Sequence, residues 1–201
     1  MEDVRRRIWE AKVPLEFVYS EEELSSFSID LKRVEHRYFF CLAPRSSYLS
    51  LLIPEIRRHF SDLFTALSNV KEMRIWFEWR GVALSPLYSL GQLFDECSNW
   101  YGDEKIVLPW DVTIRFFNPP ADLLQFNTLK NDDTLILKSH YYSTLKQADY
   151  VRTGSSKSVM NLTKSEQINL WDGLWTLSYD KFWPVFEKLL GDSADHWRHF
   201  P

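Results

Sequence analysis

The hydrophobic period of this chain changes once, at Asn118-Pro119-Pro120, and this change constrains the fold more than any other feature. Before it, several short segments alternate apolar and polar residues, which is the period of a half-buried β-strand. After it, apolar residues recur every three or four positions, which is the period of amphipathic helices. The sequence therefore predicts an α+β protein with two domains, residues 1–120 and residues 121–201, of which the second is a small helical bundle.

The first domain is predicted to mix short strands with helices. Strands are expected at residues 13–19, 37–43, 73–79, 82–84 and 110–116. Helices are expected at residues 2–10, 47–67 and 87–97. The acidic run Glu21–Glu23 is expected to form a loop, and Pro54 to kink the long helix or to mark its first turn. This order of elements predicts a ubiquitin-like β-grasp domain with an added N-terminal helix.

The first helix of the second domain, at residues 135–151, is predicted to hold Lys146 in solvent. At 100° per residue, Lys146 lies opposite an apolar stripe. The stripe consists of Leu137, Tyr141, Leu145, Ala148 and Val151. A lysine opposite such a stripe is ordinary for an amphipathic helix, so its position alone does not assign it a function.

Two further helices are predicted in the second domain. Thr163 and Glu166 have the spacing of a capping box, so one helix is expected to begin directly after Thr163. Another is expected at residues 180–190, with Pro184 near its first turn and Gly191 as its terminator.

Charge and cysteine content exclude several classes of protein. The 24 basic and 28 acidic side chains give a net charge of −4, which offers no general attraction for nucleic acid. Cys41 and Cys97 cannot form a disulfide framework and are expected to be buried thiols in a reducing compartment. No segment approaches the roughly 18 apolar residues that span a bilayer, and the first residues lack a signal peptide's apolar run. A cytoplasmic location is expected.

The sequence contains no motif that predicts catalysis or cofactor binding. GxGxxG, GxxxxGK, HExxH and CxxC are all absent. His196 and His199 lie three positions apart, but two ligands without a third do not make a metal site. Cys41 and His36 lie five positions apart on one predicted strand, so they project to opposite faces and do not form a nucleophilic pair. We expect no enzyme, no metal and no cofactor.

Two basic clusters leave a membrane-binding module as an alternative. Arg5, Arg6 and Arg7 form the first cluster, and Arg57 and Arg58 belong to the second. Each charge near an anionic membrane contributes about 1 kcal/mol to binding, so three charges bind weakly and in a salt-sensitive way. A solvated basic face is therefore the main expectation for both clusters.

Aromatic-rich strings in a fixed order give the chain a specific signature. They are RRRIWEAKVPL (5–15), YFFCLAPRSSYLSLLIPEIRRHF (38–60), IWFEWRG (75–81), SLGQLFD (89–95), LPWDVTIRF (108–116), STLKQAD (143–149), LWDGL (170–174) and YDKFWPVFEKLL (179–190). Through these strings the chain resembles the autophagy protein 5 family, whose members are acceptors in a ubiquitin-like conjugation system.

The resemblance implies a role for Lys146. In the family, the lysine of the segment that matches STLKQAD receives an isopeptide bond from the C-terminal glycine of autophagy protein 12. The family itself supplies no catalytic group. Its conjugate acts like a ubiquitin ligase with the coiled-coil partner autophagy protein 16. It recruits the lipid-conjugating, E2-like autophagy protein 3 and promotes coupling of autophagy protein 8 to phosphatidylethanolamine at the preautophagosomal membrane.

The resemblance also leaves alternatives open. Tyr142, Gln147, Asp149 and Tyr150 are expected to border the contact with autophagy protein 12, because helical positions three and four apart share a face. Some lineages bind autophagy protein 12 without a covalent bond, so a strictly non-covalent partner is an alternative. Family members continue past the segment matching residues 197–201 into a second ubiquitin-like domain, so the groove for autophagy protein 16 is expected to be incomplete here.

Overall fold

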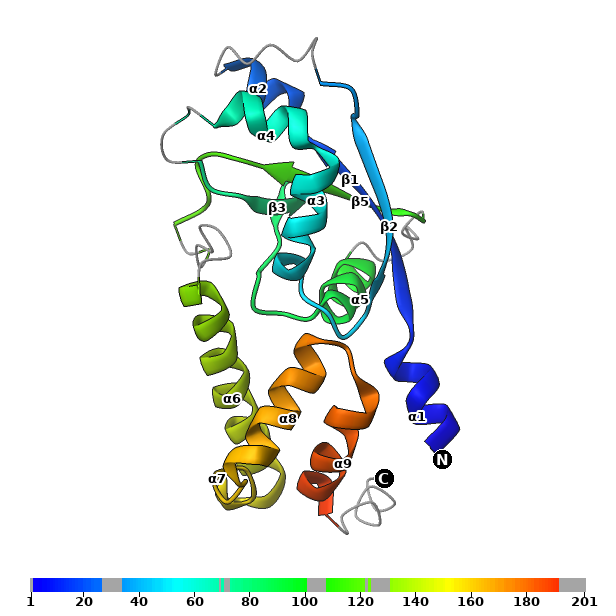
Figure 1. Ribbon diagram of the computed structural model, residues 1–201, viewed down its shortest axis with the longest axis vertical. Coiled ribbons are helices and arrows are strands. Elements are labelled where there is room, and N and C mark those ends of the chain that lie inside the picture. The colour runs from blue at the N-terminus through cyan, green and yellow to red at the C-terminus, as the bar shows by residue number, and fades with distance from the viewer. Residues whose placement is uncertain are drawn as a thin grey trace. The chain divides into compact units, whose positions relative to one another are not determined.

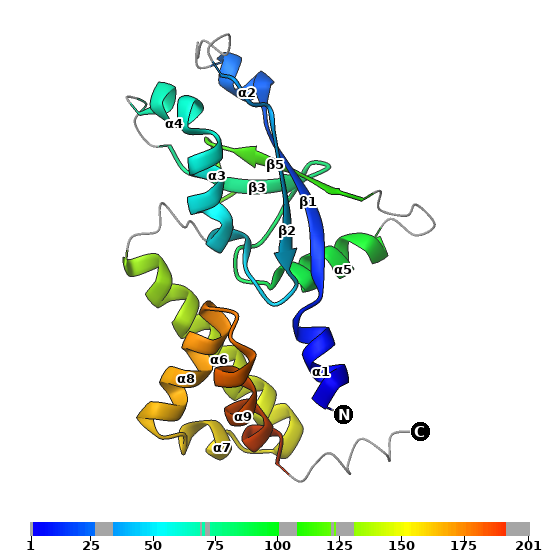
Figure 2. The same cartoon turned by 45° about the vertical axis from the view of Figure 1, so that its right-hand side comes forward.

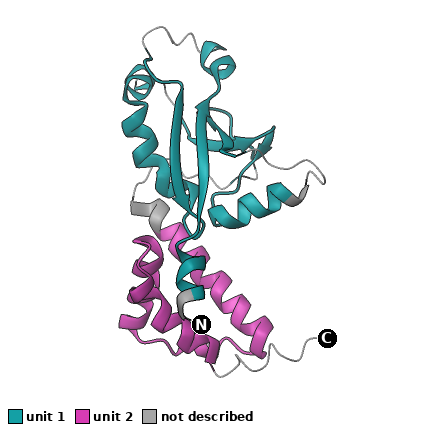
Figure 3. Ribbon diagram, turned by 90° about the vertical axis from the view of Figure 1, so that its right-hand side faces the viewer, with its two compact units in different colours: residues 1–134 teal, residues 135–201 magenta. Residues whose placement is uncertain are grey.

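The computed structural model describes residues 2–26, 34–68, 70, 73–100, 108–121, 123 and 131–191 (Figure 1). The chain divides into two compact units, residues 1–134 (unit 1) and residues 135–201 (unit 2), which Figure 3 colours separately. Unit 1 contains the sheet, and the elements of unit 2 are helices. The domain boundary predicted at residue 120 stays a prediction, since residues 124–130 lie outside the described part.

Unit 1 is built on a five-stranded sheet with the order β2-β1-β5-β3-β4. The strands are β1 (Lys12–Tyr19), β2 (Tyr38–Pro44), β3 (Trp76–Trp79), β4 (Val82–Ala83) and β5 (Trp110–Arg115). β1 is antiparallel to β2 and parallel to β5, and β5 is antiparallel to β3. This mixed topology, with helices between β2 and β3, confirms the predicted α+β class and the β-grasp arrangement.

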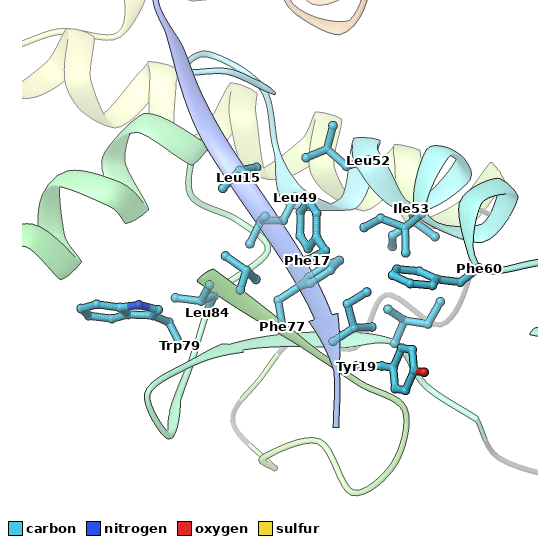
Figure 4. Packing of buried hydrophobic residues seen from close by; sticks show 14 of the residues in the cluster. Leu15, Phe17, Tyr19, Leu49, Leu52, Ile53, Phe60, Phe77, Trp79 and Leu84 are labelled. Carbon is cyan, nitrogen blue, oxygen red and sulfur yellow. The ribbon is translucent and has the colours of Figure 1, made fainter. Parts of the chain in front are cut away.

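The predicted alternation along β1 places one face of the sheet on the core. The inward residues Val13, Leu15, Phe17 and Tyr19 are all buried. Figure 4 shows Phe17 close to Leu49 and to Phe77 of β3, and the two phenylalanine ring centroids lie 5.8 Å apart. Because side chains alternate across a strand, this single pattern fixes which face of β1 meets the helices.

The long helix predicted at residues 47–67 is broken, and this prediction is corrected. It consists of a 3-10 turn η2 (Leu49–Leu52), α3 (Ile53–His59) and α4 (Ser61–Leu67). Pro54 lies in the first turn of α3, which is one of its two predicted positions. At Phe60 the backbone leaves the helical region, with φ −94° and ψ 37°, and its buried ring packs edge-on against Tyr19. In Figures 1 and 2, α3 lies on the side of the sheet that carries the core.

The acidic run Glu21–Glu23 was predicted to be a loop, and this is wrong. These residues form the first turn of α2 (Glu21–Ser26), where the Glu23 N–H donates to the Ser20 Oγ at 3.2 Å. Negative side chains and a serine cap both stabilise a helix N-terminus, so the local signal was present in the sequence. The other helices of unit 1 are α1 (Glu2–Trp9) and α5 (Leu90–Trp100), which begins three residues later than predicted.

The helices of unit 2 are α6 (Asn131–Thr153), whose first turn precedes the unit, α7 (Lys157–Met160), α8 (Lys164–Trp175) and α9 (Tyr179–Leu190). The predicted capping box is confirmed, since Thr163 and Glu166 exchange two hydrogen bonds at the start of α8. The short helix α7 was not predicted, and Pro184 lies inside α9 rather than near its first turn. Figure 2 shows α8 and α9 packed side by side.

Candidate functional site

Lys146 lies within α6, and its side chain is exposed to solvent. No described residue forms an ion pair or a hydrogen bond with its ammonium group. An exposed lysine without a partner keeps its amine accessible to a large reaction partner, whereas an ion pair holds the amine in its charged form.

The inner face of α6 departs from the predicted apolar stripe after its midpoint. The prediction is correct for Leu137, which is buried, and for Tyr141 and Leu145, which are half-buried. Ala148 is exposed, and Val151 is 85% exposed. Asp149, which is buried, and Arg152, which is half-buried, take their place. The prediction failed here because it counted apolar residues alone, while an ion pair occupies the inner face of this turn.

Asp149 and Arg152 tie the end of α6 to two other helices. Asp149 Oδ1 lies 3.1 Å from Arg152 Nη2, and the Val159 N–H donates to Asp149 Oδ2 at 3.4 Å. Arg152 also donates to the carbonyls of Leu190, at 2.6 Å, and of Leu189, at 2.5 Å. The last carbonyls of a helix have no partner within it, and a cation there also interacts favourably with the helix dipole. We call these contacts the Asp149–Arg152 cluster.

Tyr142 fixes α6 one turn before Lys146. Its hydroxyl donates to the Gln167 carbonyl of α8 at 2.5 Å. Burial, and then the negative charge of Asp172, raise the pKa of Tyr142 to about 12. The phenol therefore keeps its proton at neutral pH and remains a donor. Lys146 thus lies between two polar attachments of α6, one to α8 and one to α7 and α9.

The structure places the four predicted neighbours of Lys146 in different environments. Gln147 and Tyr150 are exposed, and Tyr142 is half-buried. The prediction is corrected for Asp149, because its side chain is only 3% exposed and offers no surface to a partner. Arg152, the residue that holds Asp149 inside, was missed, although its i+3 spacing from Asp149 is a signal for a helical ion pair.

One side of α6 combines Lys146 with exposed apolar side chains. At 100° per residue, the residues on this side are Leu135, Ser139, Ser143, Lys146 and Tyr150, and all are exposed. Leu135 and Tyr150 are each 62% exposed. We call this set the acceptor flank. Leu135 lies three helical turns before Lys146 and Tyr150 one turn after it, so this side of α6 offers apolar side chains as well as the amine.

Each of the two basic clusters has one exposed arginine. Arg7 on α1 is exposed, and the other two arginines of its cluster are half-buried. Arg57 on α3 is half-buried, with its guanidinium carbon 4.9 Å from the Phe64 ring centroid, and burial lowers its pKa. Arg58 is exposed. Both clusters therefore present less positive charge to solvent than the sequence predicted.

Nucleophilic and metal-binding groups are sparse in the described part of the chain. Cys41 and Cys97 are not bonded to each other, and burial raises the pKa of both thiols to about 11. Such thiols stay protonated near neutral pH and are poor nucleophiles. Among the described residues, no three His, Cys, Asp or Glu side chains are arranged to hold a metal. His196 and His199 lie outside these residues.

No helix in the described ranges is both long enough and apolar enough to cross a bilayer.

Comparison with known proteins gives two family matches. Residues 8–116 match the family described as "Autophagy protein ATG5, UblA domain", and residues 135–192 match "Autophagy protein ATG5, alpha-helical bundle region". Autophagy protein 5 of Drosophila melanogaster is 30% identical over 194 residues, which cover 96% of this chain and 65% of that protein. Autophagy protein 5 of Penicillium rubens is 26% identical over 210 residues, covering 98% of this chain and 63% of its own length. This chain therefore spans just under two thirds of each of these two relatives.

A solved structure shares the fold. The crystal structure of Kluyveromyces marxianus Atg5 superposes with a TM-score of 0.71 at 21% sequence identity, over 94% of this chain and 69% of that chain. The ubiquitin-like sheet and the helical region that follows it thus occur together in a known structure.

Proposed function

This chain belongs to the autophagy protein 5 family, and we propose that it is a non-catalytic scaffold that binds the ubiquitin-like modifier autophagy protein 12 through the acceptor flank. Lys146 is the covalent acceptor. The conjugate acts with autophagy protein 16 and with the E2-like autophagy protein 3 to promote lipidation of autophagy protein 8. It does so in the cytoplasm and at the preautophagosomal membrane.

The observation that carries this proposal is the environment of Lys146. Its amine is exposed and has no ion-pair partner among the described residues, while α6 is attached to other helices on both sides of it. An acceptor needs this combination, because the amine must reach into another protein's active site from a fixed backbone position. Leu135 and Tyr150 supply apolar contact area on the same side of the helix.

The reaction asks for one group from this chain. The neutral ε-amine of Lys146 attacks the thioester carbonyl that joins the C-terminal glycine of autophagy protein 12 to its conjugating enzyme. The new C–N bond forms as the C–S bond breaks, the enzyme's cysteine leaves as a thiolate, and the amine's proton passes to a base. The product is an isopeptide bond, and the catalytic groups belong to the conjugating enzyme.

The test is to mix this protein with autophagy protein 12, its conjugation enzymes and ATP, and to measure intact mass before and after denaturation. A summed mass that survives denaturation, disappears in Lys146→Arg and persists in Lys157→Arg supports the covalent acceptor. Lys157 is a suitable control because it is another exposed lysine of unit 2. A complex seen only under native conditions supports the non-covalent alternative. If no complex forms under either condition, the proposal is wrong.

A second candidate, peripheral contact with a membrane, is favoured by α1. Val4 and Ile8 are 57% and 68% exposed, lie one helical turn apart, and adjoin Arg7. A short helix with exposed apolar residues beside arginines can insert at an anionic surface. Flotation with vesicles of phosphatidylcholine and phosphatidylserine tests this. Binding that is lost in Ile8→Asp and weakened by salt supports the contact, and binding that ignores both changes contradicts it.

A further inference from the structure

Asp149 is the only acidic residue of α6 after Asp133, and it lies three positions from Lys146. A carboxylate and an ammonium at this spacing share a helical face and form ion pairs in exposed helices. An ion pair would hold the amine in its charged form and restrict the motion of the side chain. Asp149 would therefore reduce the reactivity of the Lys146 amine if its carboxylate were free to form this ion pair.

Arg152 keeps the Asp149 carboxylate away from Lys146. Both carboxylate oxygens of Asp149 are occupied, Oδ1 by Arg152 and Oδ2 by the Val159 N–H. Arg152 is itself held in place by the two terminal carbonyls of α9. To reach Lys146, the buried carboxylate of Asp149 would have to break its ion pair with the half-buried Arg152 and its hydrogen bond with the Val159 N–H, which is unfavourable.

We propose that Arg152 is a positioning residue for the conjugation of Lys146. It sequesters Asp149 and so keeps the acceptor amine unpaired, while its contacts to α9 hold the turn of α6 that follows the acceptor. This inference rests on the proposed function of Lys146. The effect of Arg152 on the reactivity of the Lys146 amine can be measured without autophagy protein 12 or any enzyme.

The first experiment measures the chemical reactivity of Lys146 directly. The whole protein is treated with a limiting amount of a water-soluble acetyl ester, and peptide mass spectrometry compares acetylation at Lys146 with that at Lys157 and Lys164. In Arg152→Gln, Asp149 loses its cation and turns toward Lys146, so the relative acetylation of Lys146 falls by up to about twofold, as expected from the strength of helical ion pairs. Circular dichroism verifies that the helices persist.

Two rescue variants separate this effect from damage to the fold. Adding Asp149→Asn to Arg152→Gln removes the competing charge and restores acetylation of Lys146. Arg152→Lys retains a cation for Asp149 and keeps acetylation near the original value. Lys188→Gln breaks a different ion pair of unit 2, between Lys188 and Glu166, and leaves Lys146 unchanged. If the double variant fails to restore acetylation, Arg152 has only a structural role and the proposal is overturned.

A surface variant tests the same idea where Arg152→Gln does not fold. Tyr150 is exposed on the acceptor flank, four positions after Lys146. Tyr150→Glu places a carboxylate there that no arginine sequesters, and its expected effect is again about a twofold loss of Lys146 acetylation relative to Tyr150→Gln. Equal acetylation in the two variants overturns the proposal, because a nearby unsequestered carboxylate would then be harmless.

Single-turnover conjugation connects this result to function. With increasing concentrations of the charged conjugating enzyme, Arg152→Gln is expected to lower the maximal rate about as much as it lowers acetylation, with the half-saturating concentration unchanged. A change in half-saturation alone would assign Arg152 to docking and overturn the positioning role. A protein whose acetylation follows the prediction but which forms no conjugate would contradict the proposed function and leave the Arg152 effect standing.

Discussion

The contacts inside unit 1 differ in kind from the contacts inside unit 2. Unit 1 has a continuous apolar core whose largest fully buried members include Trp79, Trp110 and Phe17. Unit 2 also buries apolar residues, and polar contacts tie α6 to the other helices, through Tyr142 to α8 and through the Asp149–Arg152 cluster to α7 and α9. Apolar burial is non-directional, whereas hydrogen bonds fix orientation. The helix that carries Lys146, the proposed acceptor, is thus fixed by directional contacts to its neighbours, in addition to apolar packing.

The largest effect is expected in the core of unit 1. Phe17 is fully buried, and its ring lies 6.1 Å from that of Phe39 and 5.8 Å from that of Phe77, centroid to centroid. Phe17→Ala should lower the free energy of unfolding by about 3–5 kcal/mol, through lost transfer energy and the cavity left behind. Phe40→Ala is the control, because Phe40 lies on the neighbouring strand and is 60% exposed. Urea unfolding followed by fluorescence measures both, and equal losses would break the comparison.

Unit 2 is expected to be most sensitive to backbone crowding between α8 and α9. A Cβ on Gly173 would lie 2.6 Å from the Phe182 backbone nitrogen, which is closer than real contacts allow. Gly173→Ala should therefore cost about 1–3 kcal/mol of unfolding free energy, although alanine is ordinarily the better helix former. Ser165→Ala, at an exposed position of α8, should cost nothing. Hydrogen exchange will show whether the loss is confined to unit 2, and protection unchanged throughout α8 and α9 would contradict the crowding argument.

A smaller effect is expected at the cap of α8. The Thr163 Oγ1 accepts from the Glu166 N–H at 3.2 Å. Thr163→Ala removes this acceptor and should lower the free energy of unfolding by about 1 kcal/mol. Thr176→Ala, at the other end of α8, is the matched control and is expected to cost less, because its hydroxyl satisfies no N–H of the helix. Urea midpoints of the two variants give the comparison, and a greater loss in Thr176→Ala would count against the capping box.

The smallest effects are two pH dependences of opposite sign. Hydrogen bonds from Lys188 and Thr163 lower the pKa of Glu166 to about 2, so its stabilising contribution is complete above its ordinary value of 4.5 and is lost as the pH falls toward 2. In unit 1, burial raises the pKa of Glu23, although the carboxylate accepts from two backbone N–H groups of Phe116 and Phe117. Its contribution is therefore present at low pH and is lost as the pH rises through the raised pKa.

Replacing Glu166 or Glu23 by glutamine should weaken the dependence of stability on pH, and the two replacements should act in opposite directions. Urea midpoints between pH 2 and pH 7 should fall less steeply with acid in Glu166→Gln than in the original protein. In Glu23→Gln, the urea midpoint should no longer include the decrease with rising pH that ionisation of Glu23 causes. If both variants changed the pH dependence of the urea midpoint in the same direction, the predicted difference between Glu166 and Glu23 would be wrong.

Patterns that are local in the sequence predicted the structure well. The alternation along β1 and the spacing of Thr163 and Glu166 each depend on a few neighbouring residues, and both are present as predicted. The break at Phe60 could not be found in this way, because Phe60 keeps its helical spacing while its backbone turns to bury the ring against Tyr19. Only the tertiary partner reveals that turn.

The site shows the same division. The exposure of Lys146 followed from its place on α6, whereas the inward position of Asp149 did not. A hydrophobic pattern that counts only apolar residues places Asp149 at the surface. The carbonyls at the end of α9, 37 and 38 residues later in the chain, bind Arg152 and so make its ion pair with a buried Asp149 favourable.

The parallel pairing of β1 with β5 has a consequence for synthesis. Leu15 leaves the ribosome well before its partner in β5, Trp110, which lies much later in the chain. At roughly 5–20 residues per second, β1 waits several seconds or more for that partner. One backbone edge of β1 stays unpaired during this time, so a nascent chain of unit 1 is expected to need chaperone protection until β5 has emerged.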